Sequence, residues 1–141
     1  MKRLKYVSQF APDLDRPAID ALIARAAARN AELGVTGILM SSGRMFYQVI
    51  EGPDDAIDDL FARIADDPRH QDVLLLDEEV GVTERIFADW SLRKIDLDER
   101  ADRRLEPIRD LLVAVVEHRI LVERLTHALE RALWNELAGS L

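Results

Sequence analysis

Cysteine is absent from this chain of 141 residues, which excludes disulfides, zinc–thiolate sites, iron–sulfur clusters and cysteine nucleophiles. No apolar run reaches the roughly 18 residues that a membrane-spanning helix needs, and the N-terminus lacks an apolar segment of signal-peptide length. Basic residues are also too few to balance the acidic ones: the chain has 19 lysines and arginines and 27 aspartates and glutamates, which gives a net charge of −8. Non-specific nucleic-acid binding needs the opposite charge. We therefore expect a soluble, cytoplasmic protein that binds neither nucleic acid nor membrane.

Motifs for catalysis and metal binding are also missing. The glycines at 34, 37, 43 and 52 do not form a phosphate-binding GxGxxG or GxxxxGK loop. Ser8, Ser41 and Ser42 are not set in a nucleophile elbow. The three histidines, at 70, 118 and 127, do not have the spacing of a metal site. We therefore do not expect the chain to be an enzyme or to hold a metal.

Residues 44–52, RMFYQVIEG, form one of the best strand-forming runs in the chain, because they are rich in aromatic and β-branched residues. Side chains alternate along a strand, so Phe46, Gln48 and Ile50 share one face and the residues between them share the other. Both faces are apolar, which predicts a central strand covered on both sides. A buried amide at Gln48 must find hydrogen-bond partners or cost roughly 1–3 kcal/mol.

The other segments alternate between strand and helix patterns. Further strands are predicted at residues 4–10, 35–41, 73–76 and 90–95. One helix is predicted from about Pro17 to Leu33, with Asp13 or Asp15 as its cap and Gly34 as its stop. A second is predicted to start at Pro53 and to end at Pro68.

This βαββαββ order predicts an α+β fold with a ferredoxin-like sheet. Strands joined by a helix should be parallel with right-handed crossovers, which places both helices on one face. The other face needs cover, and residues 98–141 are predicted to be a C-terminal helical cap or extension of the domain formed by residues 1–97. Apolar residues recur at helical spacing over 106–138, as one helix or as two broken near 118–120. Their spacing also suits a coiled coil interrupted at His118 and Ala132, so cover within the chain and contact with a partner both stay open.

Several polar residues fall on faces that should point inward. They are Tyr6 and Ser8 on the first strand, Asn30 and Asp67 at the ends of the two helical stripes, Arg63 beside Asp67, and Gln48. Adjacent parallel strands would bring Tyr6 and Gln48 close together. Apolar walls with a few convergent polar groups are typical of a pocket, and carboxamides can match the edge of a flat heteroaromatic ring.

Simpler explanations exist for each of these residues. Tyr6 and Gln48 could satisfy each other in a core, and Asn30 could be an ordinary residue near a helix end. Arg63 and Asp67 have the i,i+4 spacing of a surface ion pair. Trp90 is by type more often a core residue than a functional one. No single residue decides between the two interpretations.

Five segments together resemble the BLUF domain, a family of blue-light sensors that use a flavin. They are YVS at 6–8, RNAELGVTGIL at 29–39, MFYQVIEG at 45–52, ARIADDPRH at 62–70 and FADWSL at 87–92. These segments stand in the family's order and at its spacing. The resemblance covers residues 4 to about 97, and residues beyond them resemble the helical extension of short stand-alone members. It implies a bound flavin, FAD, with FMN or riboflavin as alternatives.

The family's roles transfer position by position. Tyr6 matches the electron-donating tyrosine, and Gln48 matches the glutamine between that tyrosine and flavin N5 and O4. Asn30 matches the asparagine that holds the polar edge of the ring. The remaining matches are Arg63 and Asp67 at the other carbonyl or the ribityl chain, Arg69 and His70 near the phosphate end, Ser8 and Trp90 lining the site, and Leu22 and Ile64 on either side of the ring.

The resemblance also implies the mechanism. Light-driven electron and proton transfer from Tyr6 through Gln48 leaves the amide rotated or tautomerised, and the flavin absorption shifts to the red. Many members have W-x-M where this chain has Trp90-Ser91-Leu92, and that methionine passes the change to the last strand. With Leu92 we expect the spectral change to be kept, while its coupling to the tail stays open.

Because no effector domain is recognisable, the resemblance implies a separate downstream partner protein, and we expect a homo-oligomer. Two other functions are kept. A cofactor-free ferredoxin-like binding or dimerisation module would be colourless. A flavin-dependent redox enzyme would need room for substrate at N5, where the resemblance places Gln48.

Overall fold

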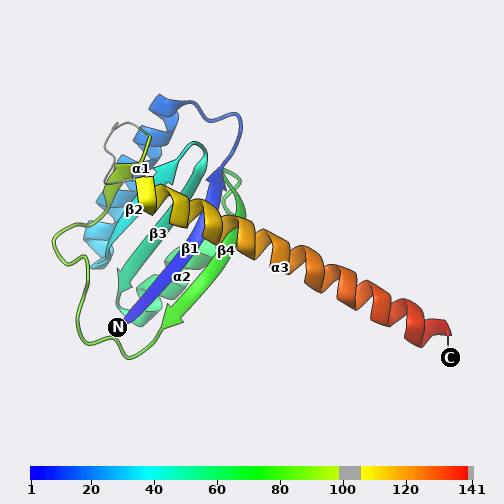
Figure 1. The fold of residues 1–141 in the computed structure, drawn as a ribbon. Helices are drawn as coiled ribbons and strands as arrows, with labels where there is room; N and C mark the ends of the chain where they lie inside the picture. Colours follow the sequence, from blue (N-terminus) through cyan, green and yellow to red (C-terminus); the bar gives the residue numbers. More distant parts are fainter. Residues whose placement is uncertain (99–105, 140–141) are drawn as a thin grey trace. The chain divides into compact units, whose positions relative to one another are not determined.

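The protein, represented by a computed structural model, is described over residues 1–98 and 106–139 (Figure 1). The chain divides into two compact units, Met1–Asp102 and Arg103–Leu141. The elements are β1 Lys2–Phe10, α1 Arg16–Leu33, β2 Thr36–Ser42, β3 Met45–Gly52, α2 Asp54–Asp66, β4 His70–Glu79, β5 Arg93–Asp96 and α3 Glu106–Gly139. This confirms the predicted α+β fold with βαββαββ order. Of the predicted extension, residues 98–141, the positions 99–105 and 140–141 lie outside the described part of the chain.

The five strands form one sheet in the order β4-β1-β3-β2-β5. β3 is central, as its two apolar faces predicted, but the prediction of adjacent parallel strands at its side is wrong. β3 is antiparallel to both β1 and β2, and β1 is antiparallel to β4. Strands joined by a helix do run in the same direction, but another strand lies between them. The one parallel pair joins β2 to β5 within the described residues.

Both helices pack on the face of the sheet that carries Gln48 (Figure 1). α1 begins where the Asp15 carboxylate accepts a hydrogen bond from the backbone N–H of Ala18, and it ends at Gly34, whose φ of 69° favours glycine. Ile23 of α1 packs with Tyr6 and Phe46 in one apolar cluster. In a second cluster, α2 packs on β1 and β3 through Ile57 and Leu60. Each helix thus packs on the sheet through its own apolar cluster. The sides of α1 and α2 that face each other are directed at the middle of the sheet.

A buried carboxylate closes one end of the sheet. Glu51 of β3 is fully buried and accepts hydrogen bonds from Arg3 Nε at 2.7 Å, from the Ile86 N–H at 2.8 Å and from the Phe87 N–H at 3.0 Å. Burial alone would raise the pKa of Glu51, but the Ile86 N–H, the Arg3 guanidinium and the Phe87 N–H together lower it. Glu51 therefore fixes the connection between β4 and β5 against the central strand.

We expect Glu51→Gln to lower the free energy of unfolding by about 3 kcal/mol, because an amide cannot accept from three donors and Arg3 loses its buried charge partner. Urea unfolding followed by circular dichroism measures the change. Glu79→Gln is the matched control, since Glu79 also binds Arg3 but is 37% exposed, so solvent screens its pair and its loss should be much smaller. Equal losses in both variants would contradict the special role of Glu51.

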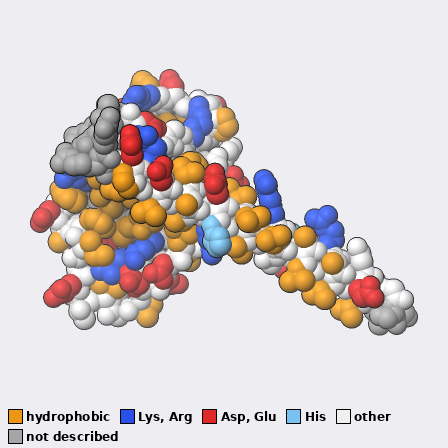
Figure 2. Space-filling view, in the orientation of Figure 1, with side chains coloured by type: hydrophobic (Ala, Val, Ile, Leu, Met, Phe, Trp, Pro, Cys, Tyr) orange, Lys and Arg blue, Asp and Glu red, His pale blue; other side chains and the backbone are white. Residues whose placement is uncertain are grey.

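α3 is one continuous helix of 34 residues, which runs through residues 118–120 without a break. Of the two alternatives for the tail, the single helix is therefore the observed one. At 1.5 Å per residue its length is about 50 Å. Large apolar side chains are exposed along it (Figure 2). Within the described residues, no helix combines the length and apolar character needed to span a membrane. Whether α3 covers the sheet stays a prediction.

Candidate functional site

Tyr6 and Gln48 face each other on the adjacent antiparallel strands β1 and β3. The Tyr6 hydroxyl donates a hydrogen bond to Gln48 Oε1, so the predicted proximity is confirmed although the strand direction differs from the prediction. Tyr6 is fully buried, with its ring edge-on to Phe46 at 5.9 Å and to Phe61 at 5.6 Å between ring centres. Burial raises the pKa of Tyr6, which keeps the phenol protonated.

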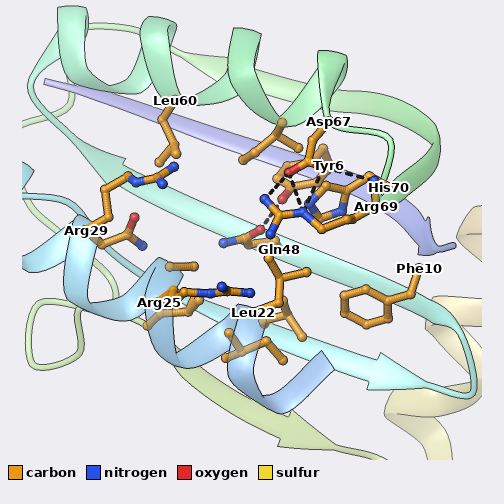
Figure 3. A pocket seen from close by; sticks show the side chains of 16 residues that line it. Tyr6, Phe10, Leu22, Arg25, Arg29, Gln48, Leu60, Asp67, Arg69 and His70 are labelled. Atoms are coloured by element: carbon orange, nitrogen blue, oxygen red, sulfur yellow. Dashed lines mark hydrogen bonds and ion pairs between the residues drawn. The ribbon is translucent and has the colours of Figure 1, made fainter. Parts of the chain in front are cut away.

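A cavity of about 190 Å³ lies between α1, α2 and the inner face of the sheet (Figure 3). Leu22 and Ile23 line it from α1, Leu60 and Ile64 from α2, and Tyr6, Phe10, Leu39 and Gln48 from the strands. With Oε1 bound to Tyr6, the Nε2 end of the Gln48 amide is left to face the cavity (Figure 3). Apolar walls around an available amide suit a flat heteroaromatic ligand.

Asn30 connects the cavity to the segment before β5. It lies at the end of the inward stripe of α1, is only 2% exposed, and lines the cavity. Its Nδ2 donates to the Ser91 carbonyl at 2.9 Å, and the next residue, Leu92, also lines the cavity. The adjacent Trp90 carbonyl accepts from the Gly37 N–H on β2. A change at Asn30 can therefore reach Ser91 through one hydrogen bond, and Leu92 directly precedes β5.

The turn after α2 places Asp67, Arg69 and His70 at the cavity. Asp67 and Arg69 form an ion pair, with Asp67 Oδ2 at 2.6 Å from Arg69 Nη2 (Figure 3). The Arg69 hydrogen bond lowers the pKa of Asp67 to about 2. Burial lowers the pKa of His70, which favours the neutral imidazole, and its buried Nδ1 has no hydrogen-bond partner in the described part of the chain. An orphaned ring nitrogen beside an open cavity suits a polar ligand group.

Acid titration should reveal the Asp67–Arg69 pair. Since the pKa of Asp67 is about 2 in the fold and 3.8 without it, the unfolded chain binds more protons between these values. The contribution of Asp67 to stability is then complete above about pH 4 and lost as the pH falls toward 2. Asp67→Asn should flatten the dependence of the unfolding free energy on pH in this window, as measured by urea unfolding. Asp66→Asn, at an exposed neighbour, should leave it unchanged.

Three predicted site residues lie outside the cavity lining. Ser8 is buried, but its hydroxyl donates to the Gln71 carbonyl at 2.9 Å. Arg63 is exposed on α2, and Asp67 pairs with Arg69 in its place, because the helix ends at Asp66 and Asp67 is extended. The strand predicted at 90–95 is also wrong at its start: β5 begins at Arg93, which leaves Trp90 in the preceding loop. Trp90 is 36% exposed there, stacked with Phe87 and under the Arg93 guanidinium.

Sequence reasoning missed two arginines that the structure brings to the cavity. Arg25 and Arg29 of α1 line it together with Leu22 of the same helix (Figure 3). Neither guanidinium has a carboxylate partner within the described residues. A signal was present, since both arginines border the apolar stripe of α1 at positions i+3 and i+7 from Leu22. With Arg69 they give the cavity three cations in a chain that is acidic overall.

Comparison with known proteins supports the geometry. Residues 1–93 match the family described as BLUF, sensors of blue-light using FAD. The chain is 41% identical over 100 residues to the photoactivated adenylate cyclase subunit beta of Euglena gracilis, an alignment that covers 70% of this chain and 12% of that protein. The chain thus spans about an eighth of that relative's length.

Solved structures show the same fold. A dark-state structure of BlrB, described as a BLUF protein, has 43% sequence identity and a TM-score of 0.68, and the alignment covers 80% of this chain and 82% of BlrB. A bacterial light-regulated adenylyl cyclase has 29% identity and a TM-score of 0.81, over 87% of this chain and 36% of the cyclase. The aligned region therefore spans most of the BlrB chain and about a third of the cyclase chain.

Proposed function

Because this chain belongs to the BLUF family, we propose that it is a blue-light photoreceptor that holds FAD non-covalently in the cavity between α1, α2 and the sheet. The observation that carries the proposal is the hydrogen bond from the buried Tyr6 hydroxyl to Gln48 Oε1 at the wall of that cavity. It supports the roles that the family resemblance implies for these two residues.

The residues at the cavity fit an isoalloxazine ring and a phosphate tail. Leu22 and Ile64 would pack against the two faces of the ring, and Asn30 and Gln48 would meet its polar edge. Arg25 and Arg29 would hold the diphosphate, and Arg69 and His70 would contact the ligand from the turn that follows α2. These cations favour FAD over riboflavin, which has no phosphate.

When bound, the flavin supplies blue-light absorption and an oxidising excited state. Tyr6 keeps its proton in the dark because burial raises its pKa, and its hydrogen bond gives the proton a path to Gln48 Oε1. The Gln48 amide can then settle with its donor and acceptor ends exchanged. One changed hydrogen bond is worth roughly 0.5–1.5 kcal/mol, so the output element must already be nearly bistable.

The contacts of Asn30 support a route for the signal out of the site. Asn30 holds the Ser91 carbonyl, Leu92 lines the cavity and β5 follows directly. Leu92 stands where many members have methionine, so we expect the spectral change to be kept and the conformational signal to pass through a branched, less flexible side chain.

We propose that the light signal acts on a separate downstream protein and that the chain has no catalytic activity of its own. We also propose that the chain self-associates as a homo-oligomer. Exposed apolar side chains along α3 support the last point. Relatives named as light-regulated cyclases carry an effector on the same polypeptide, which indicates that such domains act on catalytic partners.

Absorption spectra before and after blue light test the proposal. The purified chain should be yellow, shift to the red reversibly on illumination, and release FAD on denaturation. A colourless protein that takes up no added flavin would favour the cofactor-free binding module. Steady reduction of the flavin by a pyridine nucleotide would instead favour a redox enzyme.

A further inference from the structure

The C-terminal half of α3 carries large apolar residues on a surface with no cover. Every residue from 121 to 139 is exposed. Leu125 and Leu129 are each 60% exposed, and Leu121, Val122 and Leu133 are also exposed. Hydrophobic side chains gather along the helix in Figure 2. Helices in proteins owe most of their stability to packing of an apolar face, and isolated helices of this length are marginal in water. This half of α3 therefore needs a partner.

The spacing of these residues matches a heptad repeat. Val122 and Leu129 occupy a positions, and Leu125 and Ala132 occupy d positions. The neighbouring e and g positions carry no charged residue between 121 and 139. We call the a and d residues, together with their apolar neighbours, the seam. Leu121 and Ala128 belong to it at g positions, and Leu133 belongs to it at an e position. The a and d positions are apolar from Val122 to Ala132, and Glu136 at the next a position ends the apolar stretch. The segment 121–133 therefore fits another apolar helix.

Charge is divided between the two flanks of this seam. Glu123 and Glu130 stand at b positions, next to the e side. Arg124 and Arg131 stand at c positions, next to the g side. In a parallel pair of identical helices the g side of one faces the e side of the other, so the arginines of each copy approach the glutamates of its partner. An antiparallel pair would place glutamate beside glutamate and arginine beside arginine.

We propose that residues 121–133 of α3 form a parallel coiled coil with a second copy of this chain. The apolar seam drives the association, and the flanking charges select the parallel orientation, since exposed charge pairs contribute specificity more than affinity. The inference rests on the proposed self-association and specifies its surface and direction, but it does not depend on flavin binding.

Single cysteine variants test the orientation, because the natural chain contains no cysteine. Val122→Cys and Ala132→Cys place thiols at seam positions about 15 Å apart along the helix. In a parallel pair both should form disulfide dimers under mild oxidation, at roughly ten times the yield of the control His127→Cys, which lies opposite the seam. Non-reducing electrophoresis measures the yields. An antiparallel pair can link at most one of the two seam sites.

Light scattering on the full chain tests the surface. The natural chain should have twice the monomer mass of 16.0 kDa. Leu129→Asp should be monomeric, whereas Trp134→Asp, which changes an exposed apolar residue off the seam, should stay dimeric. A dimer without both seam disulfides would overturn the parallel orientation. A monomeric natural chain would overturn self-association, and its flavin spectrum would show separately whether the light-sensing proposal stands.

Discussion

A Tyr6→Phe variant is expected to fold and bind flavin but to lose the light-induced red shift, with a photoproduct yield lower by roughly 100-fold or more. The phenylalanine ring keeps the edge-on contacts with Phe46 and Phe61 but has no proton to give to Gln48 Oε1. The unpaired amide oxygen should cost roughly 1 kcal/mol of stability, which a domain of this size tolerates. Difference spectra at matched flavin occupancy measure the yield.

Tyr47→Phe is the matched control, since the chain has two tyrosines and Tyr47 is the neighbour of Gln48 on β3. Its half-buried ring lies on the other face of the strand, away from the cavity. The control should keep the full red shift. A shift that persists in Tyr6→Phe, or one that is lost in both variants, would contradict the role assigned to the Tyr6 hydroxyl.

Most of the fold could be predicted from local patterns in the sequence. Alternation along β3 correctly separated the face of Phe46, Gln48 and Ile50 from the opposite face, because the period of a strand is fixed by its geometry. Asp15 and Gly34 correctly marked the ends of α1, because both act on the backbone next to them. Such features depend on a few neighbouring residues and can be predicted without the fold.

The relative direction of the two strands at the site was predicted wrongly, although their adjacency was predicted correctly. The strands of Tyr6 and Gln48 were expected to be parallel neighbours, but β1 and β3 are antiparallel neighbours, and the strand parallel to β1 across its helix, β2, lies beyond β3. The partner of Asp67 was also predicted wrongly. Its spacing from Arg63 suggested a helical pair, but α2 ends one residue earlier and turns the carboxylate to Arg69. Trp90 was predicted in a strand by its residue type, but it lies in a loop that Glu51 and Asn30 hold from elsewhere in the fold.

Arg25 and Arg29 were missed because an arginine beside an apolar helical stripe is normally solvated surface. Their function depends on what lies across from them, and the sequence does not show that α2 and the turn at Arg69 face the same cavity. Three arginines and one acid, Asp67, line this cavity, so two positive charges are left unmatched there although the chain is acidic overall. This excess indicates a ligand with negative charge.

Replacing both Arg25 and Arg29 with glutamine is therefore expected to weaken FAD binding about 30-fold while leaving riboflavin affinity within about threefold. Each exposed guanidinium should contribute about 1 kcal/mol to a diphosphate contact, and a factor of ten corresponds to 1.4 kcal/mol. Fluorescence titration of the flavin-free chain with each flavin measures both affinities. The FAD affinity should also fall with added salt in the natural chain and much less in the double variant.

Arg63→Gln provides the control, because Arg63 is an exposed arginine on α2 that the family resemblance places at the ligand but the structure leaves outside the cavity lining. It should leave the affinity for both flavins unchanged. If Arg63→Gln weakened FAD binding and the double variant did not, the phosphate end would lie on the α2 side and the role given to α1 would be wrong. Equal loss of riboflavin and FAD in the double variant would show that Arg25 and Arg29 support the ring pocket and not the phosphates.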